Sequence, residues 1–60
     1  MKGGIYMSNK ELISLITNPR TWEYDYCAEA CKRAGLTDAF EKADDEHRGA
    51  VVEQAIQILK

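Results

Sequence analysis

The 60-residue sequence predicts an all-α fold, a small bundle of three to four short helices that we expect to assemble as a homodimer. Apolar residues recur at spacings of three and four, which is the period of a helix with one buried face. Capping residues, the single proline and a glycine divide these runs into segments of helical length. The sequence has no run of alternating β-branched residues and no Asn-Gly or Asp-Gly hairpin turn. These signals place helices at about residues 9–17, 20–34, 37–43 and 46–59.

The first helix has a clear start and a clear end. Ser8 and Glu11 have the spacing of a capping box, and Met7 and Leu12 have the spacing of a hydrophobic staple. Asn18-Pro19 ends the helix, because a residue before proline avoids the helical region. We therefore expect residues 7–60 to form one helical domain that begins at Met7.

Residues 1–6 have a different explanation. Met1-Lys2-Gly3-Gly4 can be encoded by a reading frame containing AAAGGAGG, the purine tract that pairs with bacterial ribosomal RNA upstream of a start codon. We expect residues 1–6 to be either a disordered tail or a translated ribosome-binding site before a true start at Met7. The second alternative assigns the gene to a low-GC Gram-positive bacterium or its phage.

The second helix is predicted to use Asn18 as its N-cap and Pro19 as its first residue, and to end at a glycine C-cap, Gly35. One face carries small residues that allow another helix to approach closely. That face consists of Tyr24, Cys27, Ala28, Cys31 and Ala34.

Thr37 is the predicted N-cap of the third helix. Two interpretations of the next segment stay open: one helix from Asp38 to Leu59, or a break at Asp44-Asp45 with a new helix after it. Three adjacent acids at 44–46 favour a helix N-terminus over a helix interior, and we therefore prefer the break.

The last helix has an apolar arc wider than one small core needs. We expect a second copy of the chain to cover part of it, because a domain of this size is marginally stable alone. The predicted dimer interface consists of Val51, Val52, Ala55, Ile56 and Leu59. The alternative is a compact monomer whose own core uses the whole arc.

Composition and residue spacing argue against several classes of function. Eight Lys and Arg stand against ten Asp and Glu, a net charge of −2, so nucleic acid is not an expected partner. No stretch approaches the roughly 20 apolar residues of a membrane span, and no signal-peptide pattern is present, so we expect a cytoplasmic protein. Cys27, Cys31 and His47 do not have zinc-site spacing, and we predict no metal, no cofactor and no enzymatic activity.

A partner-binding surface is predicted on the second helix. Three aromatic residues lie within five positions and alternate with acids, and aromatic residues dominate binding hot spots. The alternative is that one or two of these aromatics anchor the core. The predicted partner-binding residues are Trp22, Glu23, Asp25, Tyr26, Glu29 and Arg33.

The helix punctuation resembles that of short helical proteins of Bacillus-type bacteria and their phages. The resemblance covers roughly residues 27–59 and rests on Cys31-Lys32-Arg33-Ala34-Gly35-Leu36, Phe40, the acids at 44–46 and Val51-Val52-Glu53-Gln54-Ala55-Ile56. In size and kind the chain is also similar to small phage-encoded inhibitors of bacterial immunity, such as inhibitors of the Hachiman and Gabija defence systems. That resemblance implies a helical, often oligomeric protein that binds one host protein.

The sequence supports two functional hypotheses. The first is a phage or prophage protein that binds and inhibits a host defence protein, such as a helicase or nuclease, by surface complementarity. The alternative is a helix-turn-helix regulator associated with nucleic acid, built from residues 20–34, Gly35 and residues 37–43. The acids at 38–46 argue against this alternative, since a recognition helix is normally basic.

Overall fold

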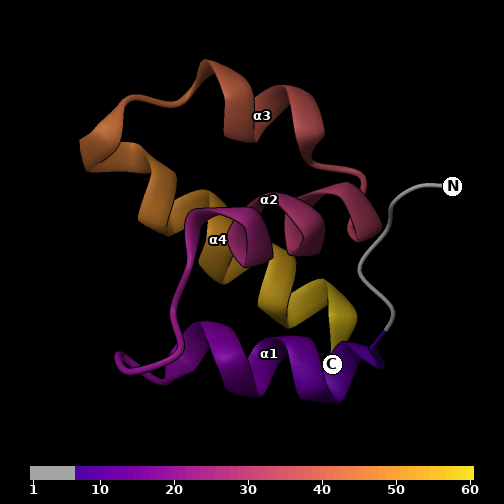
Figure 1. Cartoon of the computed structure of the whole chain (residues 1–60). Helices are drawn as coiled ribbons and strands as arrows, with labels where there is room; N and C mark the ends of the chain where they lie inside the picture. Colours follow the sequence, from indigo (N-terminus) through magenta and orange to yellow (C-terminus); the bar gives the residue numbers. More distant parts are fainter. Residues whose placement is uncertain (1–6) are drawn as a thin grey trace, which may run out of the picture.

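The computed structural model describes residues 7–60, which form four helices and contain no strand. The helices are α1 (Asn9–Thr17), α2 (Tyr24–Arg33), α3 (Thr37–Lys42) and α4 (Asp45–Leu59), as Figure 1 shows. The predicted all-α class is confirmed, and so is the break between the third and fourth helices. The expectations for residues 1–6 lie outside the described residues.

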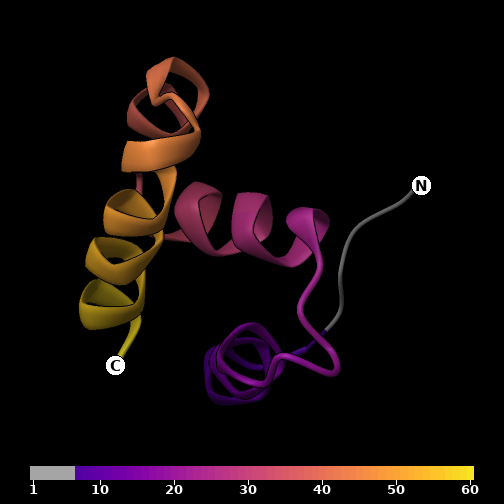
Figure 2. The ribbon, with the colours of Figure 1, turned by 90° about the vertical axis from the view of Figure 1, so that its left-hand side faces the viewer.

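Helix α2 occupies the centre of the arrangement. Helices α1 and α3 lie on opposite sides of it, and α4 packs against all three of the others. Figure 2 shows α1 end-on and α2 from its side, so the axes of these two helices cross steeply. The steep crossing leaves the start of α2 and the end of α1 joined by a six-residue loop, 18–23.

One hydrophobic core joins all four helices. Fully buried Ala30, Cys31 and Ala55 have small side chains, so α2 and α4 approach closely where they meet. The core consists of Leu12, Ile16, Cys27, Ala30, Cys31, Phe40, Val52, Ala55 and Ile56. Both cysteines are free thiols and serve as small apolar side chains there.

Helix α1 has the bounds predicted from the sequence. The Glu11 amide donates to Ser8 Oγ at 3.1 Å, and the Ser8 amide donates to Glu11 Oε1 at 3.3 Å, which together form the capping box. Met7 packs against the core, as a residue in a hydrophobic staple does. Asn18 takes the extended backbone (φ −96°, ψ 116°) that a following proline imposes.

The predicted start of α2 at residue 20 is wrong, because residues 19–21 form a turn instead. The amides of Thr21 and Trp22 donate to the Asn18 carbonyl at 3.0 and 2.9 Å, and the Arg20 amide donates to Asn18 Oδ1 at 2.9 Å. Asn18 therefore caps a tight turn that redirects the chain from α1 into the crossing α2. The helix starts at Tyr24, with Glu23 as an N-cap that makes no side-chain capping bond.

The end of α2 agrees closely with the prediction. Gly35 has a φ of 76°, and its amide donates to the Lys32 carbonyl at 3.2 Å, while the Leu36 amide donates to the Cys31 carbonyl at 2.7 Å. These two bonds form a Schellman motif, in which glycine takes the left-handed conformation at no steric cost. The helix itself ends one residue early, at Arg33.

The predicted N-cap of α3 is wrong, whereas the predicted break at Asp44-Asp45 falls where α4 begins. Leu36, not Thr37, is the N-cap of α3, because Leu36 completes the Schellman turn and its carbonyl already accepts from Phe40. Asp44 caps α4, where its side chain accepts from the His47 amide at 3.0 Å. An acid at this position also favours the helix dipole.

The arc predicted to be shared with a second chain is largely covered within one chain. Val52, Ala55 and Ile56 are buried, because α4 contacts α1, α2 and α3. Their assignment to a dimer interface depends on their being exposed in the single chain, and that expectation is wrong. Val51 and Leu59 keep partial exposure at the edge of the core. The homodimer itself stays a prediction.

Candidate functional site

An open groove of about 600 Å³ lies between the end of α1, the 18–23 loop, the start of α2 and the first three turns of α4. We call it the Trp22 groove. Its lining residues are Ile16, Thr17, Trp22, Tyr24, Cys27, Asp45, Arg48, Gly49, Val52, Glu53 and Ile56. A volume of this size is typical of sites that bind a ligand or a segment of a partner.

The floor of the groove is the edge of the core, and its rim is aromatic. Ile16, Val52 and Ile56 belong to the buried cluster. Trp22 and Tyr24 stand above them with 52% and 50% of their surface exposed. Large aromatic side chains that stay half exposed over an apolar floor are typical of a surface that becomes buried on binding.

The loop turn determines where Trp22 lies. The Thr21 hydroxyl donates to the Leu15 carbonyl at 2.9 Å and ties the loop to α1. The Trp22 amide donates to the Asn18 carbonyl at 2.9 Å, and Trp22 and Cys27 both line the groove. Burial raises the pKa of the Cys27 thiol, and the Trp22 side chain lowers it by less, so the surroundings of Cys27 disfavour the reactive thiolate form.

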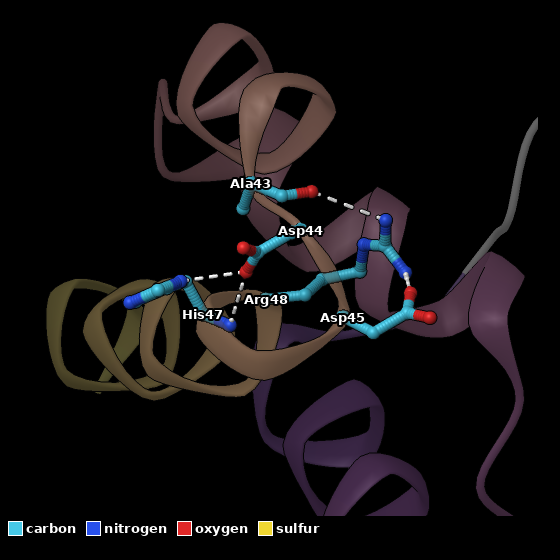
Figure 3. A network of polar contacts seen from close by, with 5 residues as sticks. All are labelled: Ala43, Asp44, Asp45, His47 and Arg48. Carbon is cyan, nitrogen blue, oxygen red and sulfur yellow. Dashed lines mark hydrogen bonds and ion pairs between the residues drawn. The ribbon is translucent and has the colours of Figure 1, made fainter.

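Arg48 forms the rim opposite Trp22. Its guanidinium donates to Asp45 Oδ1 at 2.7 Å and to the Ala43 carbonyl at 3.1 Å, as Figure 3 shows. The guanidinium carbon also lies 5.5 Å from the centre of the Tyr24 ring and 5.8 Å from that of Phe40. These contacts fix Arg48 and offset its charge locally, so the rim cation is not free to bind an anion strongly.

Asp44 and His47 form a separate pair at the start of α4. The ring nitrogen Nδ1 of His47 lies 2.6 Å from Asp44 Oδ1, and both side chains are largely exposed, away from Arg48 (Figure 3). The hydrogen bond with the His47 side chain, and to a smaller extent that from the His47 amide, lowers the pKa of the Asp44 carboxyl. This pair caps a helix and does not line the groove.

The structure divides the predicted partner-binding surface. Trp22 lines the groove, and Glu23 and Asp25 are exposed beside it. Tyr26 is half-buried and packs against the core. Nine helical positions separate Tyr24 from Arg33, which places these two residues on opposite sides of α2.

Arg33 and Glu29 belong to an interhelical brace. Arg33 Nε lies 2.8 Å from Glu29 Oε2, and Nη1 donates to the Met7 carbonyl at 2.8 Å and to Asn9 Oδ1 at 3.0 Å. These bonds tie α2 to the N-terminus of α1. The expected exposure of Arg33 and Glu29 is wrong, because only 20% and 18% of their side-chain surface is exposed. Their part in partner binding stays a prediction.

Tyr24, Arg48, Gly49 and Glu53 line the groove but are not among the predicted site residues. The sequence pattern places Tyr24 on the small-residue face of α2, whereas the buried face is centred on Cys27, Ala30 and Cys31. Gly49 offers the one usable signal, since a glycine inside a helical pattern commonly has a packing or functional reason.

The exposed side of α3 bears on the helix-turn-helix alternative. Thr37, Asp38, Glu41 and Lys42 are exposed there, so two acids accompany one lysine. A surface with this balance does not favour DNA phosphates.

Within residues 7–60, no three His, Cys, Asp or Glu side chains come together in the manner of a metal site. No helix in that range combines the length and apolarity needed to cross a membrane.

Comparison with known proteins found no matching family model, no similar curated protein and no similar solved structure.

Proposed function

We propose that this protein binds a surface of another protein through the Trp22 groove and acts by occupying that surface. The observation that carries the proposal is the pair of half-exposed aromatics, Trp22 and Tyr24, beside an apolar groove floor. Burying such side chains gives a large favourable free energy, and interfaces concentrate their affinity in residues of this type.

We further propose that the protein comes from a phage or prophage and inhibits a cytoplasmic defence protein of the bacterial host, such as a helicase or nuclease. Two resemblances support this identity: helix punctuation like that of short helical proteins of Bacillus-type bacteria and their phages, and a size and kind similar to phage inhibitors of bacterial immunity. Inhibition by occupation needs no catalytic group, cofactor or metal in the inhibitor.

Affinity capture with groove variants tests the proposal. Tagged wild-type protein is used to capture host proteins from a Bacillus-type lysate, with Trp22→Ala and Tyr24→Ala as groove variants. Ile58→Ala is the matched control, because Ile58 is 59% exposed and does not line the groove.

We expect one specific host protein to be retained by wild type and Ile58→Ala and lost by both groove variants. The purified partner should then lose activity when wild type is added at stoichiometric amounts. Capture that is indifferent to Trp22→Ala, or no specific capture at all, would contradict the proposal.

A further inference from the structure

We propose that the partner element seated in the Trp22 groove is an amphipathic helix with basic residues beside its apolar stripe. This inference rests on the proposed function, and it adds the chemistry of the partner. Three features carry it: the path of the groove along α4, the glycine in its wall and the excess of acids at its rim.

The groove runs along one stripe of α4. The lining positions 45, 48, 49, 52, 53 and 56 recur at spacings of three and four, so they share one face of the helix. This stripe is about 16 Å long at 1.5 Å per residue. Apolar anchors at i, i+4 and i+7 of a partner helix span about 10 Å and fit within it. An extended segment would find few backbone partners on walls whose amides are already paired within helices.

Gly49 leaves space in the wall that no described residue fills. A Cβ built at Gly49 meets no atom within 4 Å, so no neighbour in the described fold requires a glycine there. A glycine inside a helix nevertheless lowers its stability relative to alanine. Binding offsets this loss of helix stability if an apolar side chain of a partner packs directly on the α4 backbone at Gly49.

The rim of the groove favours a basic partner. Among the lining residues, Asp45 and Glu53 are acids and Arg48 is the only cation. The Asp45 side chain is 94% exposed although it pairs with Arg48, so it keeps oxygens available to solvent. Glu23 adds an exposed acid next to Trp22 and Tyr24 in sequence, against one further exposed cation at Arg20. Complementary charge on the partner therefore means lysines or arginines flanking the apolar stripe.

The single tryptophan of the chain reports on this groove directly. Two synthetic helical peptides without Trp or Tyr carry the same leucine stripe, one flanked by lysines and the other by glutamates. We expect the lysine peptide to shift Trp22 emission to shorter wavelength in a saturable way, with an affinity that falls as salt is added. The glutamate peptide should bind about tenfold more weakly or worse, because it meets like charge at the rim.

Matched variants test whether the peptide binds in the Trp22 groove. Gly49→Leu should abolish the saturable shift, while Ala50→Leu, an equally large change at the next exposed position of α4, should leave it intact. Circular dichroism checks that both variants stay helical. Glu53→Gln should weaken lysine-peptide binding and reduce its salt dependence, whereas Glu41→Gln on α3, outside the groove lining, should change neither.

Four results would overturn the inference: no saturable binding of the lysine peptide, equal binding of both peptides, binding indifferent to Gly49→Leu, or a dimer in sedimentation equilibrium that Gly49→Leu disperses. The last result would identify a second copy of this chain as the occupant. Because host-protein capture is measured separately, a Trp22-dependent capture without peptide binding would leave the proposed function standing. Peptide binding without any capture would contradict the proposed host partner alone.

Discussion

Two arginines lie on opposite sides of α2. Arg33 makes long-range contacts that close its side of the helix, whereas Arg48 makes local contacts that leave its side open. Arg33 reaches residues 24 and 26 positions away in sequence, Asn9 and Met7, and its side chain and that of Glu29 are only 20% and 18% exposed. Arg48 bonds to Asp45 and Ala43, three and five positions away, and leaves the Trp22 groove open beside it.

The difference concerns the range of the contacts. The Arg33 contacts join two helices and close the side of α2 that faces the N-terminus of α1. The Arg48 contacts organise the α3–α4 junction and an aromatic rim without closing the gap to the 18–23 loop. We infer that the first side contributes mainly stability and the second mainly binding.

Removing the two guanidinium groups is the strongest way to break this comparison. Arg33→Met should lower the free energy of unfolding by about 2 kcal/mol, because it removes charge-assisted bonds and leaves Glu29 largely buried and unpaired. Arg48→Met should cost less than about 1 kcal/mol, since its partner Asp45 is exposed. Urea denaturation monitored by circular dichroism measures both. Equal losses would show that the two sides contribute alike.

A second test on the closed side of α2 is removal of the capping box at the start of α1. Ser8→Ala should lower the free energy of unfolding by about 1 kcal/mol, because the Glu11 amide loses its acceptor next to the residues that bind Arg33. Ser14→Ala, in the exposed middle of α1, is the matched control and should be neutral or slightly stabilising. A Ser8→Ala protein as stable as the wild type in urea would disprove a contribution from the box.

On the open side, a stabilising substitution is expected. Gly49→Ala should raise the free energy of unfolding by about 0.5–1 kcal/mol, because alanine is the better helix former and no neighbouring atom of residues 7–60 outside the α4 backbone lies within 4 Å of its methyl group. The same urea titration measures the gain, with Ala50→Gly as the reverse change at a neighbouring exposed position. A loss of stability in Gly49→Ala would mean that the glycine serves packing within the chain.

The smallest effect concerns pH at the start of α4. The folded pKa of Asp44 is lowered, so its contribution is fully present above its unfolded pKa of about 4 and is lost as pH falls through the folded pKa. Asp44→Asn should therefore lose stability relative to wild type at pH 6, and the gap should narrow as the pH falls below the unfolded pKa of about 4. Unfolding curves at a series of pH values measure this gap, and a gap constant with pH would contradict the assignment.

The sequence predicts most helix ends correctly because those signals are local. Ser8 with Glu11, the Asn18-Pro19 stop, Gly35 and Asp44 each bind backbone groups within a few residues, so their geometry does not depend on the rest of the chain. The same holds for the choice of two helices over one after residue 37. Trp22 is likewise a groove residue that the sequence singles out, because it precedes a helix among other aromatics and acids.

The segment after Asn18 could not be predicted in the same way, since Asn18-Pro19 is compatible with both a helix start and a turn. The direction that α2 must take across α1 decides between them, and it moves the start of the helix to Tyr24. That crossing also sets which residues of α2 face inward, and so places Tyr24 at the rim and Tyr26 against the core.

By itself, then, the sequence determined an all-helical chain, the places where its helices stop and the chemistry of its exposed aromatics, because these depend on hydrogen bonds and periodicity within a few residues. Only the tertiary structure decided that three helices cover the apolar arc of α4, that Arg33 braces α1 and that Gly49 opens onto a groove beside Trp22. Those outcomes depend on contacts between residues far apart in sequence, whose pairing no local pattern specifies.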